Sequence, residues 1–236
     1  MRVLIIILLF SSCSSKSWRE ASRESVHIAP KASELKEAIF QIYYARAFSW
    51  RGAFGVHPWI AWKSLEDKSY TVAQVTSWNR RRSKSTVSVV EDLPDRMWFD
   101  HRPHLLLEIR GEQAQEIIAQ LPKLISEYPF QDSYTLWPGP NSNTFVSYII
   151  RNIDEIKIEL PPHAIGKDYF GASQFFSKTA SQMGYQFSLF GLLGLSVGVG
   201  EGIEFNILGL NFGIDFYTPA LKLPFIGRLG FDDKKM

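Results

Sequence analysis

The sequence predicts an α+β fold, in which an antiparallel sheet carries helices on one side and a long glycine-rich β-hairpin follows at the C-terminal end. Residues 52–63 and 70–78 are rich in aromatic and β-branched residues and flank the turn-like segment SLEDKS, a pattern typical of paired antiparallel strands. Residues 111–129 carry apolar side chains at helical spacing. Residues 185–216 alternate partially and contain regular glycines, which indicates two strands that turn at GVGEG.

The chain has 236 residues and a formal net charge of +2, so it is long enough for one large domain and almost neutral. This balance argues against a nucleic-acid partner, because nucleic-acid-binding domains usually carry a dense basic face. Arg80, Arg81, Arg82 and Lys84 form the one basic cluster. We interpret it first as an exposed loop and second as a contact for an anionic lipid or polymer. The sequence leaves the oligomeric state open.

The first residues have the features of an export signal. Arg2 precedes eight apolar residues, Val3 to Phe10, and small residues lead to Cys13. The apolar run is too short to cross a bilayer, which takes about 20 residues. Small residues before a lone cysteine resemble the lipobox of bacterial lipoproteins, although Phe10 stands where that motif usually has leucine. The resemblance implies a signal peptide at 1–12, a lipid on Cys13, and a protein anchored in the bacterial cell envelope on the periplasmic side. The alternative is an ordinary secretory signal.

The remaining elements follow from local patterns. Residues 13–30 are polar and predict a tether to a single α+β domain at 31–236. Residues 31–48 predict a helix, because Leu35, Ala38, Ile39 and Ile42 share one helical face. A short third strand is expected at 85–90, and Pro122 predicts a kink or restart in the helix over 111–129. A further helix is expected from about Asn143 to Asn152, and the apolar tail is expected to lie across the sheet surface.

The sequence lacks the motifs that are typical of proteins that bind common cofactors. The sequence has no Walker loop, no dinucleotide fingerprint and no HExxH helix, so we expect neither a cofactor nor a metal. His101 and His104 are three residues apart, but Pro103 breaks any helix that would align them. The tryptophans are interpreted as core or rim residues, although a cluster of them near Ser142 would suit a lipid or a sugar face.

Ser142 and His57 are the candidate reactive residues. Ser142 lies in the segment WPGPNSNTFVSYIIR, where a turn leads into a helix. At a helix start, free N–H groups favour an ionised nucleophile and can hold an oxyanion. Asn and Ser are also the preferred helix N-caps, so a capping role for Ser142 stays open. Strand alternation separates His57 from Val56 and Pro58, and His57 would act as a general base or be satisfied by a backbone carbonyl.

A histidine on a strand, a second strand, a helix and then a nucleophile at a helix start resemble the permuted papain-like superfamily of NlpC-related amidases and lecithin–retinol acyltransferase relatives. The resemblance covers roughly His57 to Ile153 and implies a papain-like arrangement, with serine in place of the usual cysteine. Under it, Ser142 is the nucleophile, His57 the base, and the N–H groups of Ser142 and Asn143 serve the oxyanion. A third polar group on the next strand would orient His57; Gln74 is the candidate and Ser77 the reserve.

The motifs RGAFGVHPWIAWK, PDRMWF, WPGPNSNTFV, PHAIGKDY, FSLFGLLG and ALKLPFIGRLGF, in this order, resemble an uncharacterised bacterial family, a domain of unknown function. That resemblance spans about 51–231 and implies a shared fold without an activity.

Two functions from different classes follow. One is an envelope hydrolase or acyltransferase that uses Ser142 and His57 on an amide or ester, such as a cell-wall peptide or an acyl lipid. The other is a catalytically silent envelope protein that binds a cell-wall, lipid or protein partner through the 185–216 hairpin. An exposed apolar face on that hairpin would support the second.

Overall fold

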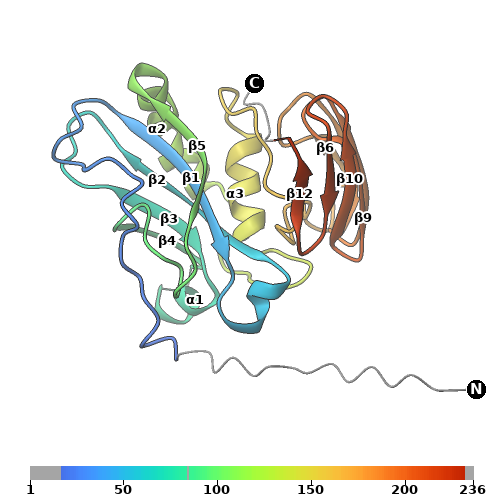
Figure 1. The fold of residues 1–236 in the computed structure, drawn as a ribbon, viewed down its shortest axis with the longest axis horizontal. Coiled ribbons are helices and arrows are strands. Elements are labelled where there is room, and N and C mark those ends of the chain that lie inside the picture. The colour runs from blue at the N-terminus through green and yellow to red at the C-terminus, as the bar shows by residue number, and fades with distance from the viewer. Residues whose placement is uncertain (1–16, 84, 232–236) are drawn as a thin grey trace, which may run out of the picture.

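The computed structural model describes residues 17–83 and 85–231. They form two antiparallel sheets and three α-helices, which confirms a mixed α+β fold with a β-rich C-terminal region. In Figure 1 helix α3 stands between the five-stranded sheet and the seven-stranded sheet. Cys13 and the predicted signal peptide lie outside the described residues. No helix in the described part of the chain is both long and apolar enough to span a bilayer.

The first sheet has the order β4-β3-β2-β1-β5, and each neighbouring pair is antiparallel. The strands predicted in 52–63, 70–78 and 85–90 are present, and the basic segment between the last two is a short helix. The bounds are β1 Ile39–Arg46, β2 Val56–Lys63, β3 Thr71–Val75, β4 Val87–Glu91, β5 His104–Arg110, the 3-10 helix η1 Ser49–Ala53, and α1 Ser77–Ser83.

The helix predicted at 31–48 is wrong, because β1 occupies the second half of that range, as an inner strand between β2 and β5. Both faces of β1 are covered: Ile42 packs with the helices, whereas Tyr43 packs in an aromatic cluster on the other side. A strand buried on both faces shows no polar alternation. The apolar spacing from Leu35 to Ile42 was therefore mistaken for a helical face. β5 was not predicted.

Helices α2 (Gly111–Ser126) and α3 (Ser142–Arg151) pack on one face of this sheet. Pro122 lies inside α2 without ending it. Helix α3 is one residue earlier than predicted and is buried almost all round, because one side meets the first sheet and the other meets the second. Phe145 and Ile149 of α3 are fully buried in the main core.

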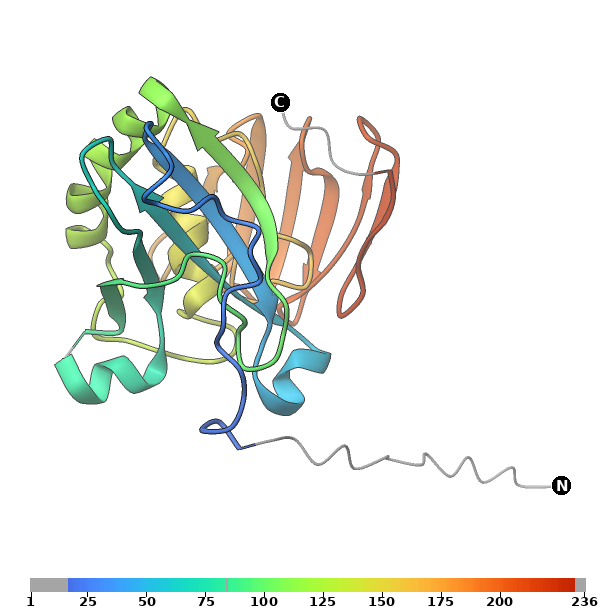
Figure 2. The same ribbon diagram turned by 60° about the vertical axis from the view of Figure 1, so that its left-hand side comes forward.

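The second sheet is a seven-stranded meander, seen edge-on in Figure 1 and from another side in Figure 2. The predicted two-stranded hairpin at 185–216 is instead four strands, although GVGEG does form the turn between β8 and β9. The predicted tail adds two more strands at the edge. The bounds are β6 Phe176–Lys178, β7 Gly184–Leu189, β8 Leu193–Gly198, β9 Gly202–Ile207, β10 Leu210–Asp215, β11 Ala220–Leu223 and β12 Gly227–Gly230.

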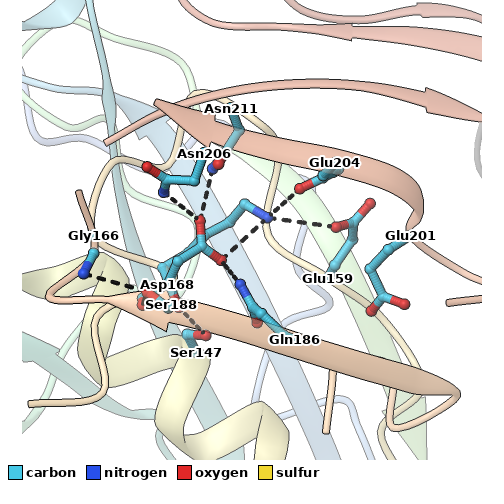
Figure 3. Close-up of polar contacts among 12 residues, drawn as sticks. Ser147, Glu159, Gly166, Asp168, Gln186, Ser188, Glu201, Glu204, Asn206 and Asn211 are labelled. Atoms are coloured by element: carbon cyan, nitrogen blue, oxygen red, sulfur yellow. Dashed lines mark hydrogen bonds and ion pairs between the residues drawn. The ribbon is translucent and has the colours of Figure 1, made fainter. Parts of the chain in front are cut away.

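The second sheet turns its polar side chains inward. Gln186, Ser196, Glu204 and Lys222 are buried on the side facing the rest of the protein. Asp168, in the loop that enters this sheet, accepts hydrogen bonds from Gln186, Asn206 and Asn211, as Figure 3 shows. These contacts fix the sheet against α3 and the loop that follows it.

An ionic cluster completes this polar interface. Lys167 Nζ lies 2.7 Å from Glu204 Oε2 and 3.6 Å from Glu159 Oε2, and Lys222 Nζ pairs with both carboxylates. Burial and the neighbouring Glu204 raise the pKa of Glu159 to about 8. Burial alone would raise the pKa of Glu204, but Lys167 and Lys222 together lower that pKa to about 2. Of these two glutamates, Glu204 is therefore the one whose charged form the lysines favour more strongly.

The segment expected as a tether is partly docked. From residue 21 onward it runs along the first sheet, where the Asp95 carboxylate accepts hydrogen bonds from the N–H groups of Ile28 and Ala29. Ala21 is buried, and Tyr70 donates to the Pro30 carbonyl.

Candidate functional site

The described residues enclose a cavity of about 810 Å³ at one end of the first sheet. Its walls come from η1, from the start of β2, from the end of β3 with α1, and from the start of α3. Turns of the second sheet close one side through Leu208 and Phe225. Cavities of roughly 300–1,000 Å³ with aromatic walls and a few polar groups are typical ligand sites. The aromatic lining residues are Phe48, Trp50, Phe54, Trp78, Trp98, Tyr134, Trp137 and Phe225.

Asn141, and not Ser142, caps helix α3. The Asn141 Oδ1 atom accepts hydrogen bonds from the N–H groups of Asn143 (2.9 Å) and Thr144 (3.2 Å). In return, the Thr144 hydroxyl accepts from the Asn141 N–H, which completes a capping box. The Asn141 amide group donates to the carbonyls of Leu136 and Ile165. This leaves Ser142 at the first helical position without a capping role.

Ser142 lines the cavity and is almost fully buried. Among the described residues, neither its hydroxyl nor its N–H makes a hydrogen bond. Asn143 also lines the cavity, but its N–H is held by Asn141 Oδ1, so the predicted oxyanion pair is reduced to one free N–H. The Asn143 side chain donates to the carbonyls of Val56 and Ile165, and its Oδ1 atom is buried without a partner.

His57 and Gln74 are brought together. Gln74 Oε1 lies 3.0 Å from His57 Nε2, so the amide oxygen accepts a hydrogen bond from the Nε2–H group, and Nδ1 is the unprotonated nitrogen of the neutral ring. The His57 ring stacks on Trp98, with 3.7 Å between the ring centres. Burial lowers the pKa of His57 to about 3, against the opposing effect of the Gln74 hydrogen bond. The imidazole is therefore neutral near pH 7.

The structure does not join His57 to Ser142. Both residues line the cavity, but no hydrogen bond connects them. Val56 belongs to the core under the helices, whereas the neighbours of His57 are Trp59 and Trp98 on the opposite face of the sheet. The cavity therefore passes around the end of the sheet, with Ser142 on one side and His57 on the other. The catalytic roles of Ser142, His57, Gln74 and Asn143 stay predictions.

Sequence reasoning missed several polar residues of the cavity. Thr76 lines it at the end of β3, and its hydroxyl is buried without a partner. Arg51 and the exposed Arg81 add two positive charges to the lining. Ser77 also lines it but does not touch His57 in the way Gln74 does. The basic cluster around Arg81 was visible in the sequence; its place at a cavity was not.

The comparisons with known proteins assign the chain to a family. Residues 37–169 match the model of DUF3750, a family described as proteins of unknown function. The chain belongs to this family. The DUF3750 match begins just before β1 and ends just after Asp168, so it contains RGAFGVHPW and WPGPNSNTFV, whereas FSLFGLLG and the second sheet lie beyond it. No curated protein and no solved structure matches the chain.

Proposed function

We propose that this protein binds an anionic amphiphile in the aromatic cavity. The observation that carries the proposal is the combination of aromatic walls with the Ser142 hydroxyl, which lines the cavity and has no hydrogen bond within the described residues. A ligand oxygen or N–H group in the cavity could pair with this hydroxyl. The aromatic walls favour an apolar body, such as an acyl chain or a ring.

The acidic group of the proposed ligand is inferred from two arginines of the cavity. Arg51 and Arg81 line the cavity, whereas none of the described residues that line it is acidic. A carboxylate or phosphate at this position would gain charge-assisted hydrogen bonds. Because Arg81 is exposed, its contribution is screened by water and stays modest.

Tryptophan quenching tests this binding directly. Trp50, Trp78, Trp98 and Trp137 line the cavity, so a brominated fatty acid held there will quench the intrinsic fluorescence saturably. Arg81→Ala is expected to weaken binding of the acid roughly two- to five-fold, the range for an exposed ion pair, and to leave a brominated alcohol unaffected. Arg82→Ala is the matched control, because Arg82 neighbours Arg81 on α1 but does not line the cavity. Quenching that never saturates, or equal effects of both substitutions, would refute the proposal.

A second candidate function is hydrolysis or acyl transfer with Ser142 as nucleophile and His57 as base, in a papain-like arrangement. It is favoured by the finding that Asn141 caps α3 and leaves the Ser142 hydroxyl unengaged in the cavity. Binding ranks above it for two reasons. His57 faces away from the helix side of the sheet, and a pKa of about 3 makes its imidazole a weak base.

A fluorophosphonate probe separates the two functions. Nucleophilic chemistry predicts labelling that is lost in both Ser142→Ala and His57→Gln and retained in Ser77→Ala, whose serine lines the same cavity. Absence of label on Ser142, together with saturable fatty-acid binding, would leave binding as the function.

We also propose that the protein is lipid-anchored through Cys13 in the bacterial envelope, on the basis of the leader sequence. Mass spectrometry of the N-terminal peptide from native membranes tests this. A diacylglyceryl thioether on Cys13 is expected, and an unmodified Cys13 in the mature chain would exclude the anchor.

A further inference from the structure

In an ordinary sheet of a soluble protein the outward side chains are polar, but in the second sheet they are mainly apolar. Cross-strand partners point to the same side, and one outward row is apolar or aromatic from β7 to β12. Its residues are Tyr185, Val197, Ile203, Ile214, Leu221 and Leu229. The next outward row repeats this with Phe176, Phe187, Leu195, Phe205 and Phe212. Most of these side chains are exposed; Phe205, for example, is 53% exposed. We call this surface the outward face of β6–β12.

The charged side chains of residues 176–231 lie mainly on the side of the sheet opposite its outward face. Residues 176–231 contain six charged side chains: Lys178, Glu201, Glu204, Asp215, Lys222 and Arg228. Glu201, Glu204, Asp215 and Lys222 are buried, and Arg228 pairs with Asp215 at 2.8 Å. Only Lys178, on the edge strand β6, shares the outward side, since its partner across the strands is Tyr185. The ionic cluster with Lys167 and Glu159 holds the polar side inward, so the apolar side cannot exchange places with it.

The exposed apolar surface continues into the turns at both ends of the strands. Leu208 between β9 and β10 is 62% exposed, and Phe216 between β10 and β11 is 64% exposed. The same holds for Phe190, Val199, Tyr217 and Ile226. Contiguous apolar surface of this extent marks an interaction site.

A lipid bilayer fits this surface better than a protein. Protein interfaces have a polar rim and about one hydrogen bond per 100–200 Å². Here the outward rows offer no hydrogen-bonding side chain beyond Tyr185 and Lys178, and the turns, which would form the rim, are apolar as well. A second copy packed face to face would cover the rows and leave Leu208 and Phe216 in water. A bilayer surface covers rows and turns together and requires no hydrogen bonds from the face.

We propose that the outward face of β6–β12 docks on a phospholipid bilayer, with its apolar side chains in the boundary between headgroups and acyl chains. Apolar faces buried to this depth give reversible membrane binding that grows with the apolar area. The proposal does not require the cavity ligand or the lipid on Cys13, since the rows that carry it do not line the cavity; of the turn residues named above, Leu208 belongs to both surfaces.

The experiment measures whether a label on the outward face of β6–β12 enters the bilayer. In the full chain with Cys13→Ser, an environment-sensitive NBD label is placed at Phe205→Cys. The matched control carries the label at Val89→Cys, an exposed apolar position of β4 in the first sheet. Vesicles of phosphatidylethanolamine and phosphatidylglycerol are added, with and without spin-labelled lipids. We expect a blue shift, an intensity increase and quenching by the spin-labelled lipids at Phe205→Cys, and none of these at Val89→Cys.

Three results decide the question. Loss of the Phe205→Cys shift after Leu195→Asp and Phe212→Asp, on its two neighbouring strands, would support docking through this face. If the chain co-sediments with vesicles while the Phe205→Cys label stays in water, the N-terminal segment alone holds the chain and the proposal is overturned. If the label shifts without vesicles and light scattering gives a doubled mass, the face binds a second copy and the proposal is likewise overturned.

Discussion

Replacing Asn141 with alanine tests the structural basis of the candidate site. Its side chain makes five hydrogen bonds: two accepted from the N–H groups at the start of α3, a long one of 3.5 Å accepted from the Thr144 hydroxyl, and two donated to the Leu136 and Ile165 carbonyls. Loss of an Asn cap costs about 1 kcal/mol. The Ile165 carbonyl keeps its bond from Asn143, so the Leu136 carbonyl alone loses its partner, at a further cost of about 1 kcal/mol. We expect Asn141→Ala to destabilise the protein by about 2 kcal/mol.

Ser142→Ala is the control for the destabilisation expected of Asn141→Ala. The Ser142 hydroxyl has no hydrogen bond within the described residues, and alanine is the better helix former, so a change below about 0.5 kcal/mol is expected. In thermal unfolding followed by circular dichroism, Asn141→Ala should lower Tm by about 4–8 °C for a chain of this size, and Ser142→Ala should leave Tm nearly unchanged. If Ser142→Ala lowers Tm as much as Asn141→Ala does, Ser142 is a capping residue and the assignment of the cap is refuted.

Two further predictions concern buried charge. Burial lowers the pKa of His57 to about 3, so the unfolded chain binds more protons than the folded chain below pH 6.5. The free energy of unfolding, measured with denaturant, should therefore fall as the pH drops from 6.5 toward 3. His57→Gln should flatten this pH dependence, and substitution of the exposed His27 should not. Glu204→Gln leaves Lys167 and Lys222 short of a carboxylate and should cost about 3–5 kcal/mol in denaturant unfolding. Glu37→Gln, which removes an exposed pair with Arg110, should cost less than about 1 kcal/mol, and equal losses would contradict the cluster's role.

The sequence predicted elements that carry a clear apolar stripe or are bounded by turn residues. α2 and α3 have one apolar stripe each, and β2 to β4 are bounded by turn residues, so all five were found near their true limits. β1 is buried on both faces, as β2 is, but the apolar residues from Leu35 to Ile42 also fit a helical face, and β1 was therefore missed. In the second sheet the alternation was visible, but the chain turns at Leu208–Gly209, where both residues have positive φ. That turn usually carries Asn or Asp, and a leucine in its place gives no turn signal.

The same limits apply to the candidate site. Strand parity separated His57 from Val56 correctly and placed Gln74 within reach of His57, because parity is a local property. Which face of the sheet the helices cover is a tertiary property, and local patterns do not encode it. The expected approach of His57 to Ser142 rested on that choice of face. The polar lining at Thr76 was invisible for the same reason, since a threonine at the end of a strand has no distinctive pattern.

The cavity and the second sheet are physically coupled, although the family match ends before that sheet begins. The Trp137 indole N–H donates to the Leu208 carbonyl at 2.9 Å, and Gly209 lies so close to the same ring that an added Cβ would stand 2.9 Å from its nitrogen. Trp137 and Leu208 both line the cavity. A displacement of the turn between β9 and β10 would therefore also displace Trp137 in the cavity wall. A bilayer docked on the outward face of β6–β12 would therefore lie next to an aromatic cavity suited to an amphiphile, and the two proposals, tested separately, describe adjoining surfaces of one protein.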